Sequence, residues 1–589
     1  MGVLGRRISL AALLGLLAGC ASALFLTTLA LVTNLQTAHP WLLGLLPLAG
    51  GLIAWFYTRY GRAAAGGNNL ILDQIDAPEG HGVPLRMFPL VLGGTLATHL
   101  FGGSAGREGT AVQMGGSIAG TLARLAQLDV EDTRLLLMAG ISAGFGSVFG
   151  TPLAGTVFGM EVLALGGMRY AALIPCLIAA CVGDWTVRAL HVPHSHYVLL
   201  AMPELTPLLL GQVVCASFAF AGASALFSEA TYWIEHTAKR LVPQPIVRTM
   251  VGGVLVILLT LACGTRSYNG LSLPLIAQAF TPAGVPDAAW LWKLVLTALT
   301  LGVGFKGGEV TPLFVIGATL GATLGHLMGA PSELMAALGF IAVFAAAANT
   351  PLACLIMGVE LFGSAPLLLM GIATVVAYAS SGHRGIYLSQ RILTPKSHRP
   401  TVALHHVSLR EVRHAAQTVG ALALPWSASQ RGQAAQQRPS LAELRSATPL
   451  AYLVRETACI PQVEAQEYGL LRIYLRMEER LVTGKHHWRM FGTPLYRHIV
   501  TWARTHGLPK AVVKQTLHGY GDHELNPDPW VVEAPNTHLT IYVEIAGARA
   551  DLDSFVRRHA EHLQGHVMVY HAGSDPHQAV RIQPLAPKS

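Results

Sequence analysis

Long apolar runs recur along the chain from about Leu10 to Ser381. Clear examples are Leu208 to Phe227, Thr249 to Gly264 and Leu334 to Ala348. A run of about 20 apolar residues can cross a hydrocarbon core as a helix. Several runs are shorter or are interrupted by glycine, and unpaired backbone cannot face lipid. The pattern therefore predicts an all-α polytopic membrane domain over 1–394, whose broken helices are buried in protein or line a watery ion path.

The pattern changes abruptly after Tyr387. Pro395 to Gln437 is rich in His, Arg, Gln, Ala and Ser, which predicts a cytoplasmic linker over 395–467. A small α+β domain is expected over 468–575, followed by a flexible tail over 576–589. Its predicted elements are the strand Leu470–Leu475, the helix Pro494–Thr505, the strand Thr537–Ile545, the helix Asp551–His562 and the strand Val567–Tyr570. Two strand–helix units in series favour a ferredoxin-like fold.

The apolar part contains an internal repeat. The run from Thr151 to Glu161 matches the run from Thr350 to Glu360 at Thr, Pro, Leu, Ala, Gly and Glu, 199 positions later. A second pair, Gly106–Thr110 and Gly307–Thr311, is separated by 201 positions. Two matches at nearly one offset indicate a duplicated membrane unit, and substrate sites in such proteins form at the repeat interface from broken helices.

Composition and charge agree with a membrane protein. Hydrophobic residues make up 52% of the chain and charged residues 12%, with a mean hydropathy of +0.46, whereas soluble domains are about 25% charged. The net charge of +8 is scattered, so we interpret it as membrane topology and not as a nucleic-acid site. Arg6 and Arg7 precede the first run, which predicts a cytoplasmic N-terminus. Leu16 to Cys20 resembles a lipoprotein processing site, but the run continues to Val32 and favours an uncleaved helix.

Six of the seven cysteines lie in or beside apolar segments, and their spacing is not that of metal ligands. We therefore expect no disulfide, no metal site and no cofactor.

The run from Gly102 to Thr110 lies between two hydrophobic segments and contains Arg107 and Glu108. Glycine-rich backbone at the start of a helix presents N–H groups and partial positive charge, which favour an anion. A carboxylate at membrane depth costs about 2.5 to 3.5 kcal/mol, so Glu108 is a functional candidate. It could occupy the anion site itself, or leave it on protonation and so couple anion movement to proton movement. The alternative is that Glu108 caps its own helix or pairs with Arg107.

This run resembles the gating-glutamate motif of the CLC channels and transporters, and the Leu-Ala-Gly run before Glu161 and the duplicated halves are similar to that family. The resemblance covers about residues 1–395. It implies a homodimer with one pore in each subunit, two inverted halves, and Glu108 as the external gate. It also implies a multi-pass protein of the bacterial inner membrane, with the C-terminal domain in the cytoplasm.

Three departures from the chloride-handling pattern are similar to the fluoride–proton antiporter clade of that family. Gly67-Asn68-Asn69 replaces a loop with a central serine, Val162 replaces an internal proton-relay glutamate, and Gly308-Glu309-Val310-Thr311-Pro312 replaces a Gly-x-Phe-x-Pro loop. Fluoride is strongly hydrated, and its dehydration needs strong donors such as an amide or a hydroxyl. The resemblance implies export of fluoride in exchange for protons, which confers fluoride resistance.

Roles follow by analogy. Glu108 is the mobile, proton-accepting gate, Glu309 and Thr311 are a coupled pair in the second half, and Asn68 lies at the inner anion site. Glu309 could instead cap its helix, and Asn68 could be a turn residue. Tyr387 resembles the inner-gate tyrosine of the family, although interfacial tyrosines are also common as anchors. The expected anion-binding residues are Gly67, Asn68, Asn69, Gly106, Arg107, Gly109, Thr110, Val310 and Tyr387.

The C-terminal domain resembles a PII-like bacterial domain of unassigned role, through Leu470–Tyr474, Gly492–Tyr496 and Gly519–Gly521. The resemblance implies a tendency to form trimers and a cleft for a nucleotide or another small molecule. For the whole chain, a chloride–proton antiporter or passive chloride channel of the same fold is the closest alternative. A regulatory sensor is disfavoured because Glu108, Glu309 and Thr311 are present. An enzyme is disfavoured because no nucleophile–base pair stands out.

Overall fold

The structure is a computed structural model. It describes residues 3–76, 82–194, 202–281, 284–396, 407–413, 468–476, 480–481, 493–515, 540–563, 568–572 and 579–582. The chain divides into two compact units, Met1–Trp426 and Ser427–Ser589, and each is considered by itself.

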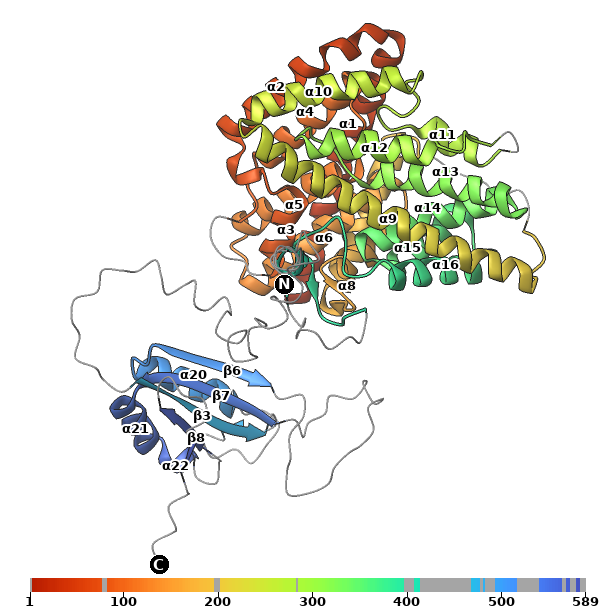
Figure 1. Ribbon diagram of the computed structural model, residues 1–589. Helices are drawn as coiled ribbons and strands as arrows, with labels where there is room; N and C mark the ends of the chain where they lie inside the picture. The colour runs from red at the N-terminus through yellow and green to blue at the C-terminus, as the bar shows by residue number, and fades with distance from the viewer. Residues whose placement is uncertain are drawn as a thin grey trace, which may run out of the picture. The chain divides into compact units, whose positions relative to one another are not determined.

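The first unit is built from helices (Figure 1). Its first half contains α1 (Val3–Ala38), α2 (Leu46–Tyr60), α3 (Gly67–Asp76), α4 (Met87–Leu100), α5 (Glu108–Leu125), α6 (Val130–Phe149), α7 (Pro152–Glu161) and α8 (Leu173–Ala189). Its second half contains α9 (Pro207–Leu241), α10 (Pro245–Ala262), α11 (Leu273–Ala279), α12 (Ala289–Gly302), α13 (Val310–Met328), α14 (Ser332–Ala348), α15 (Pro351–Phe362) and α16 (Leu367–Ser380). Short 3₁₀ turns occur at Pro40–Leu45, Arg62–Ala64 and Tyr170–Ala172.

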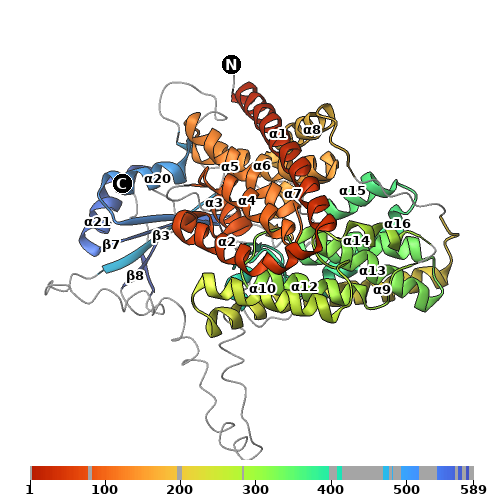
Figure 2. The same cartoon turned by 90° about the horizontal axis from the view of Figure 1, so that it is seen from above.

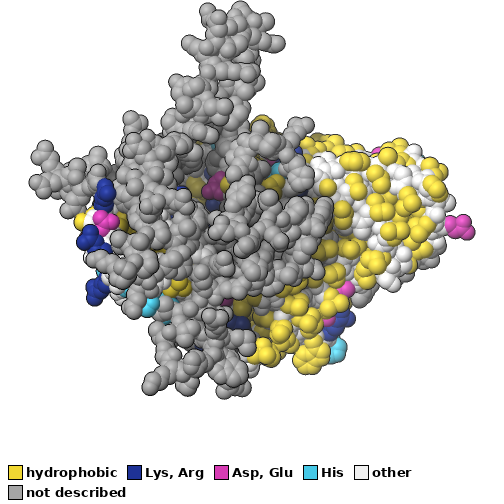
Figure 3. Space-filling model, turned by 90° about the horizontal axis from the view of Figure 1, so that it is seen from below, with side chains coloured by type: hydrophobic (Ala, Val, Ile, Leu, Met, Phe, Trp, Pro, Cys, Tyr) yellow, Lys and Arg dark blue, Asp and Glu magenta, His cyan; other side chains and the backbone are white. Residues whose placement is uncertain are grey.

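Several of these helices have the length and composition of membrane spans. Within the described residues, six are long and apolar enough to cross a bilayer: Leu4–Ala38, Pro40–Tyr60, Tyr170–Ala189, Pro207–Leu241, Pro245–Ala262 and Val310–Met328. Large apolar side chains such as Leu208 and Leu258 are exposed on this unit. Figure 3 shows a broad hydrophobic area with few charges on the described surface. Figure 2 shows α1 running beside α8, so helices distant in sequence pack together.

The repeat seen in the sequence is also a repeat of backbone geometry. Gly150 follows α6 and Asn349 follows α14, and both are in the left-handed conformation, with φ of 73° and 58°. Thr151 and Thr350 follow with nearly equal angles, and a proline then begins α7 and α15. A left-handed residue ends a helix and proline suits the first helical turn. The same few residues therefore create the same break in both halves.

The two short helices α7 and α15 stabilise each other across the halves. The carboxylate of Glu161, at the end of α7, accepts from the backbone N–H groups of Leu352 (3.1 Å) and Ala353 (2.8 Å) at the start of α15. Glu360, in α15, accepts from Leu153 (3.0 Å) and Ala154 (2.8 Å) in the same way. Each carboxylate satisfies N–H groups that a helix start leaves unpaired and interacts favourably with the helix dipole.

The chain continues past α16 through Tyr387 and packs back on the helices. β2 (Arg391–Ile392) pairs in parallel with β1 (Ala164–Leu165), which follows α7. Residues 407–413 hydrogen-bond to this stretch, through Leu409 N to Gln390 O (3.0 Å) and Arg410 N to Leu388 O (2.9 Å). These residues lie inside the predicted linker 395–467. That prediction missed their contact with the helical unit. The contact depends on one apolar side chain, Leu409, buried against Leu165 and Ile392, and a single leucine gives no recognisable pattern in the sequence.

The second unit contains a five-stranded sheet in the order β6-β7-β3-β8-β9, with every neighbouring pair antiparallel. Its strands are β3 (Tyr468–Arg476), β6 (Lys510–Gln515), β7 (Thr540–Ala548), β8 (Met568–Ala572) and β9 (Ala579–Ile582). The helices are α20 (Leu495–Thr505), α21 (Arg549–Arg558) and α22 (Ala560–Leu563), and β4 (Arg480–Leu481) pairs with β5 (Thr493–Pro494). Alternate residues of β3 and β7, such as Ile473 and Val543, pack against Ile499 and Phe555 of the helices.

β9 lies in the segment 576–589, for which a flexible tail was expected. Its four residues are too few to show a clear alternation in the sequence, and they join the sheet only by pairing with the edge of β8.

Candidate functional site

The loops that precede α5 and α13 meet at the centre of the first unit. Gly106 N donates to Gly308 O at 2.6 Å, and Gly308 N donates to Gly106 O at 2.7 Å. A side chain at Gly106 would meet Pro312 Cδ at 2.7 Å, so this close approach requires glycine. The pairing places the N-terminal ends of two helices, one from each half, beside each other.

Glu108 crosses this junction. Its carboxylate is fully buried and accepts hydrogen bonds from the backbone N–H of Thr311 (2.9 Å) and from the Thr311 hydroxyl. Arg107 Nε lies 3.3 Å from the other carboxylate oxygen. Of the two structural alternatives for Glu108, the pairing with Arg107 is present, but the carboxylate does not cap its own helix α5. The helix that it caps is α13 of the opposite half, so these contacts hold an anionic group at a helix start.

The start of α5 has no equivalent cap. Among the described residues, no oxygen atom accepts from the backbone N–H groups of Gly109 or Thr110. The Asn68 side chain, from the first turn of α3, lies here. Its Nδ2 is 3.1 Å from the position that a Cβ on Gly109 would occupy, and its Oδ1 is buried without a described partner. This arrangement has the donors that bind a small anion.

Glu309 breaks the symmetry of the site. It precedes α13 as Arg107 precedes α5, and its side chain makes no capping hydrogen bond. It is partly exposed, whereas Glu108 is buried. Thr311, which we expected to act as a pair with Glu309, hydrogen-bonds to Glu108. Glu309 is thus a carboxylate without a capping role at the repeat interface.

The other predicted anion-binding residues lie around this junction in different settings. The Thr110 hydroxyl bonds to the Thr95 hydroxyl of α4 at 2.7 Å. Asn69 Oδ1 accepts from Ser389 N at 3.0 Å, two residues after Tyr387. The rest are located as follows: Val310 is buried at the start of α13, Gly67 begins α3 with φ of 58°, and the buried ring of Tyr387 meets Phe158 edge-on at 6.4 Å.

A small cavity adjoins Glu108 and Thr311. Its other walls are Arg107, Phe149, Leu273, Ile276, Phe314, Phe340 and Leu361. The space of about 20 Å³ holds a guest the size of one water molecule. Two polar groups and an arginine therefore face a confined space with apolar walls, which suits a small dehydrated ion.

Sequence reasoning missed two polar residues that support the Glu108 loop. His99 lies between Thr95 O (2.8 Å) and Ala105 O (3.1 Å). Lys293, on α12, is fully buried, and its Nζ lies 2.9 Å from Ser104 Oγ. The signal for Lys293 was present in the sequence, because a lysine inside an apolar helix marks a functional candidate.

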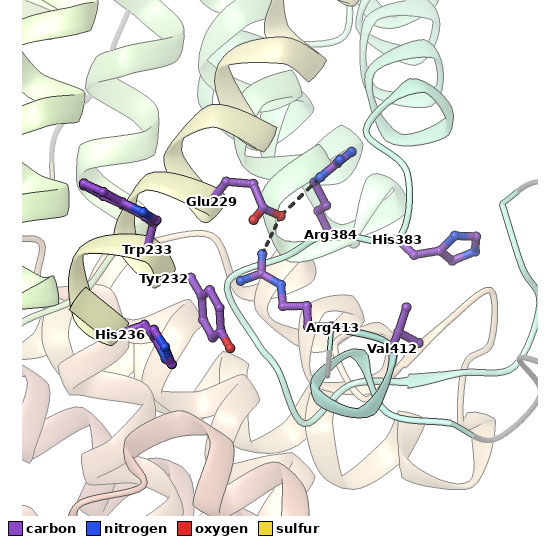
Figure 4. Close-up of a pocket in the computed structure, with 8 residues that line it drawn as sticks. All are labelled: Glu229, Tyr232, Trp233, His236, His383, Arg384, Val412 and Arg413. Atoms are coloured by element: carbon purple, nitrogen blue, oxygen red, sulfur yellow. Dashed lines mark hydrogen bonds and ion pairs between the residues drawn. The ribbon is translucent and has the colours of Figure 1, made fainter. Parts of the chain in front are cut away.

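A larger pocket lies elsewhere on this unit, near the C-terminal end of α9. Figure 4 shows Glu229 between two arginines, Arg384 at 3.2 Å and Arg413 at 2.9 Å, and the Arg413 guanidinium lies 4.6 Å from the centre of the Tyr232 ring. None of the predicted site residues lines it. Its contacts fasten residues 407–413 to α9.

Comparison with known proteins places this geometry in a family. Residues 49–382 match the family model described as voltage gated chloride channel. A chloride/fluoride channel protein of Pseudomonas syringae pv. tomato is 49% identical over 404 residues, which is 67% of this chain and 88% of that protein. A putative ClcB-like chloride channel protein of Ralstonia nicotianae is 30% identical over 59% of this chain and 86% of its own length.

A solved structure gives the same answer. The crystal structure of a CLC-type fluoride/proton antiporter aligns with a TM-score of 0.64 at 36% identity, over 66% of this chain and 98% of that chain. The match covers part of the chain, as expected for the helical unit alone. This chain therefore belongs to the voltage gated chloride channel, or CLC, family of membrane anion channels and transporters.

Proposed function

We propose that this protein exports fluoride across the bacterial inner membrane in exchange for protons and so confers fluoride resistance. The observation that carries the proposal is the Glu108 carboxylate, bonded to the N–H and the hydroxyl of Thr311 in the opposite half. The relative at 49% identity is named a chloride/fluoride channel protein, and the solved structure at 36% identity is of a CLC-type fluoride/proton antiporter, which supports fluoride as the transported anion.

Proton coupling follows from the contacts of Glu108. As a carboxylate it fills the anion site at the start of α13. Protonation converts one oxygen from acceptor to donor and removes the charge that the helix start and Arg107 attract. The neutral side chain then leaves, and the donors of Thr311 become available to an anion. Fluoride and proton therefore move in opposite directions through the same group.

Selectivity for fluoride rests on the density of donors. The Thr311 hydroxyl, the backbone N–H groups at the two helix starts and the Asn68 amide are within one small region. Small anions of high charge density gain most from short, charge-assisted hydrogen bonds. Tyr387 acts as the inner gate, beyond which the anion reaches the cytoplasm.

Glu309 receives the proton on the second half. It is available for this because it caps no helix and is partly exposed. In this mechanism Glu309 takes the role of the internal proton-relay glutamate, whose position is occupied by Val162 in this chain. Protons then pass between Glu309 and Glu108 as the gate changes position.

The assembly proposed is a homodimer through the helical unit, with the N-terminus and the C-terminal domain in the cytoplasm. The domain boundaries 394/395, 467/468 and 575/576 are part of the same proposal. We assign a ferredoxin-like, PII-like fold to the C-terminal domain. The order β6-β7-β3-β8, with α20 between β3 and β6 and α21 between β7 and β8, supports this fold. Its ligand would be a nucleotide or another small molecule.

The test is fluoride efflux from liposomes that contain the purified protein, with internal pH recorded and chloride as the competing anion. Wild type is expected to take up protons as fluoride leaves. Glu108→Gln and Glu309→Gln are expected to lose proton uptake by about tenfold or more, because neither amide can titrate. Glu131→Gln is the control, since Glu131 is an exposed carboxylate on α6.

Each result leads to a different conclusion. Efflux of fluoride with proton uptake, lost in both variants, supports the antiporter. Chloride flux equal to or faster than fluoride flux points to a chloride transporter of the same fold. Anion flux without proton movement in wild type points to a channel.

A further inference from the structure

Lys293 on α12 is a fully buried lysine, and its surroundings are unusual for a cation. Its Nζ lies near four oxygen atoms and no carboxylate: Gly270 O (2.7 Å), Ser104 Oγ (2.9 Å), Ser272 Oγ (2.9 Å) and Tyr268 O (3.2 Å). Burial of a charge is costly unless it is paired or fully hydrogen-bonded. None of the ion pairs among the described residues includes Lys293.

The oxygen atoms around Nζ form an environment that suits an ammonium group. The Ser272 hydroxyl donates to Asn269 O at 3.2 Å, and the Ser104 hydroxyl donates to Tyr268 O at 2.9 Å. Both serine oxygens therefore face Nζ as acceptors. The carbonyl oxygens of Tyr268 and Gly270 can only accept. A neutral amine would turn its lone pair toward one of these acceptors, whereas an ammonium group has only donors.

Lys293 hydrogen-bonds to two segments that lead to the cavity beside Glu108. One segment is the loop from Ser104 to Glu108, whose Arg107 and Glu108 line the cavity, and the other runs from Ser272 into α11, whose Leu273 and Ile276 line it. Ser104 is also held by the Thr297 hydroxyl at 2.8 Å and forms an isolated bridge with Gly270. The ammonium group thus fixes the base of the gate loop, four residues before Glu108.

The charge is found in one half only. The helices α4 and α12 have equal length and equivalent places in the two halves, and the residue of α4 that corresponds to Lys293 is Val91, a buried aliphatic side chain. Arg107 and Glu108 neutralise each other as a pair. Lys293 therefore adds to the second half a cationic group that forms no ion pair among the described residues.

We propose that Lys293 determines anion occupancy of the cavity beside Glu108. Its ammonium group positions the Ser104–Glu108 loop and supplies the positive potential that retains a small inorganic anion there. The inference rests on the proposed function, in which the transported anion passes through this cavity. Unit charges at a distance of several ångströms in a medium of effective dielectric about 20 change affinity by about tenfold or more.

The experiment measures flux against fluoride concentration in liposomes for Lys293→Met, Lys293→Arg and Ser272→Ala, with the thermal unfolding midpoint of each. Lys293→Met removes the charge, Lys293→Arg keeps it, and Ser272→Ala keeps the charge but removes one contact. We expect Lys293→Met to raise the half-saturating fluoride concentration about tenfold, with the number of protons per fluoride unchanged. Lys293→Arg is expected to stay within about threefold of wild type, as is Ser272→Ala, because both keep the charge.

An unchanged half-saturating concentration in Lys293→Met overturns the inference. An equal rise in Lys293→Met and Ser272→Ala also overturns it, since loss of a contact would then explain the effect. If Lys293→Met does not fold, Lys293→Gln replaces it, with the same criterion. If wild type transports chloride and not fluoride, the proposed function fails. The same series measured with chloride still tests the role of Lys293.

Discussion

Glu108 and Thr311 come from opposite halves of the repeat, and the carboxylate of Glu108 caps α13, whose first turn contains Thr311. The pair is separated by 203 positions in sequence. Its two hydrogen bonds make the gate part of the junction between the halves. An anion that replaces the carboxylate must satisfy the same donors.

Thr311 is expected to contribute through its hydroxyl. Thr311→Val removes the donor but keeps the shape, and a hydrogen bond to a charged group contributes about 1.5 to 3 kcal/mol. We expect proton-coupled fluoride flux to fall by about tenfold or more, while Thr311→Ser retains most of it. Flux is measured with fluoride and pH electrodes on the same liposomes. Equal fluoride flux in Thr311→Val and Thr311→Ser would show that the Thr311 hydroxyl is not required for transport.

Asn68 is expected to set the preference for fluoride. Asn68→Ala removes the amide next to Gly109, and loss of a donor to an anion costs about 1.5 to 3 kcal/mol. The ratio of fluoride to chloride flux should therefore drop by roughly tenfold or more. Asn68→Gln, which keeps the amide, serves as the matched variant. If the ratio of fluoride to chloride flux in Asn68→Ala equals the wild-type ratio, Asn68 does not determine selectivity, and the alternative of a turn residue is favoured.

The carboxylates of Glu161 and Glu360 are expected to stabilise the helical unit without taking part in transport. Each caps a helix of the other half, and a cap with a favourable dipole contact is worth about 1 to 2 kcal/mol. Glu161→Leu and Glu360→Leu should each lower the thermal unfolding midpoint in detergent. The number of protons per fluoride should not change. A changed number in either variant would mean that the carboxylate carries protons.

The C-terminal domain is expected to lose stability on acidification. The His559 ring stacks on Trp502 at 4.3 Å, and burial lowers the pKa of His559, with a further contribution from nearby His506 and Arg558. An unfolded histidine has a pKa of about 6.5, so the unfolded domain binds more protons below that pH. The stabilisation is therefore present above about pH 6.5 and is lost as pH falls.

Hydrogen exchange of the full chain tests this, with rates in α20 and α21 corrected for the intrinsic effect of pH. Protection should decrease from about pH 7.5 to about pH 5.5. His559→Phe keeps an aromatic stack on Trp502 but cannot titrate, and it should reduce the pH effect. The same loss of protection in this variant would exclude His559 as the cause.

The sequence predicted the features that depend on local pattern. The match between Thr151–Glu161 and Thr350–Glu360 corresponds to two equivalent short helices, and the predicted helix Pro494–Thr505 differs from α20 by one residue at its start. The strand β6 was missed, because Lys510–Gln515 alternates only weakly between polar and apolar residues. Periodicity thus located elements wherever one face is clearly apolar.

Contacts between the halves could not be predicted in the same way. The repeat indicated that Glu108 and Thr311 lie at one interface, yet their partners depend on which loop faces which. We expected Glu309 and Thr311 to act as a pair, and the Thr311 hydroxyl donates to Glu108. Lys293 is surrounded by oxygen atoms from residues that lie between 21 and 189 positions away, so no local spacing reveals its role.

During translation, α7 is synthesised long before Glu360, the residue whose carboxylate caps the start of α7. Leu153 and Glu360 are 207 positions apart, and synthesis at about 5 to 20 residues per second separates them by roughly 10 to 40 seconds. During that interval a ten-residue helix, too short to span a bilayer, has open N–H groups at its start. The N–H groups of Leu153 and Ala154 therefore lack their carboxylate partner until translation has passed α15, and a nascent chain truncated before Glu360 never acquires it.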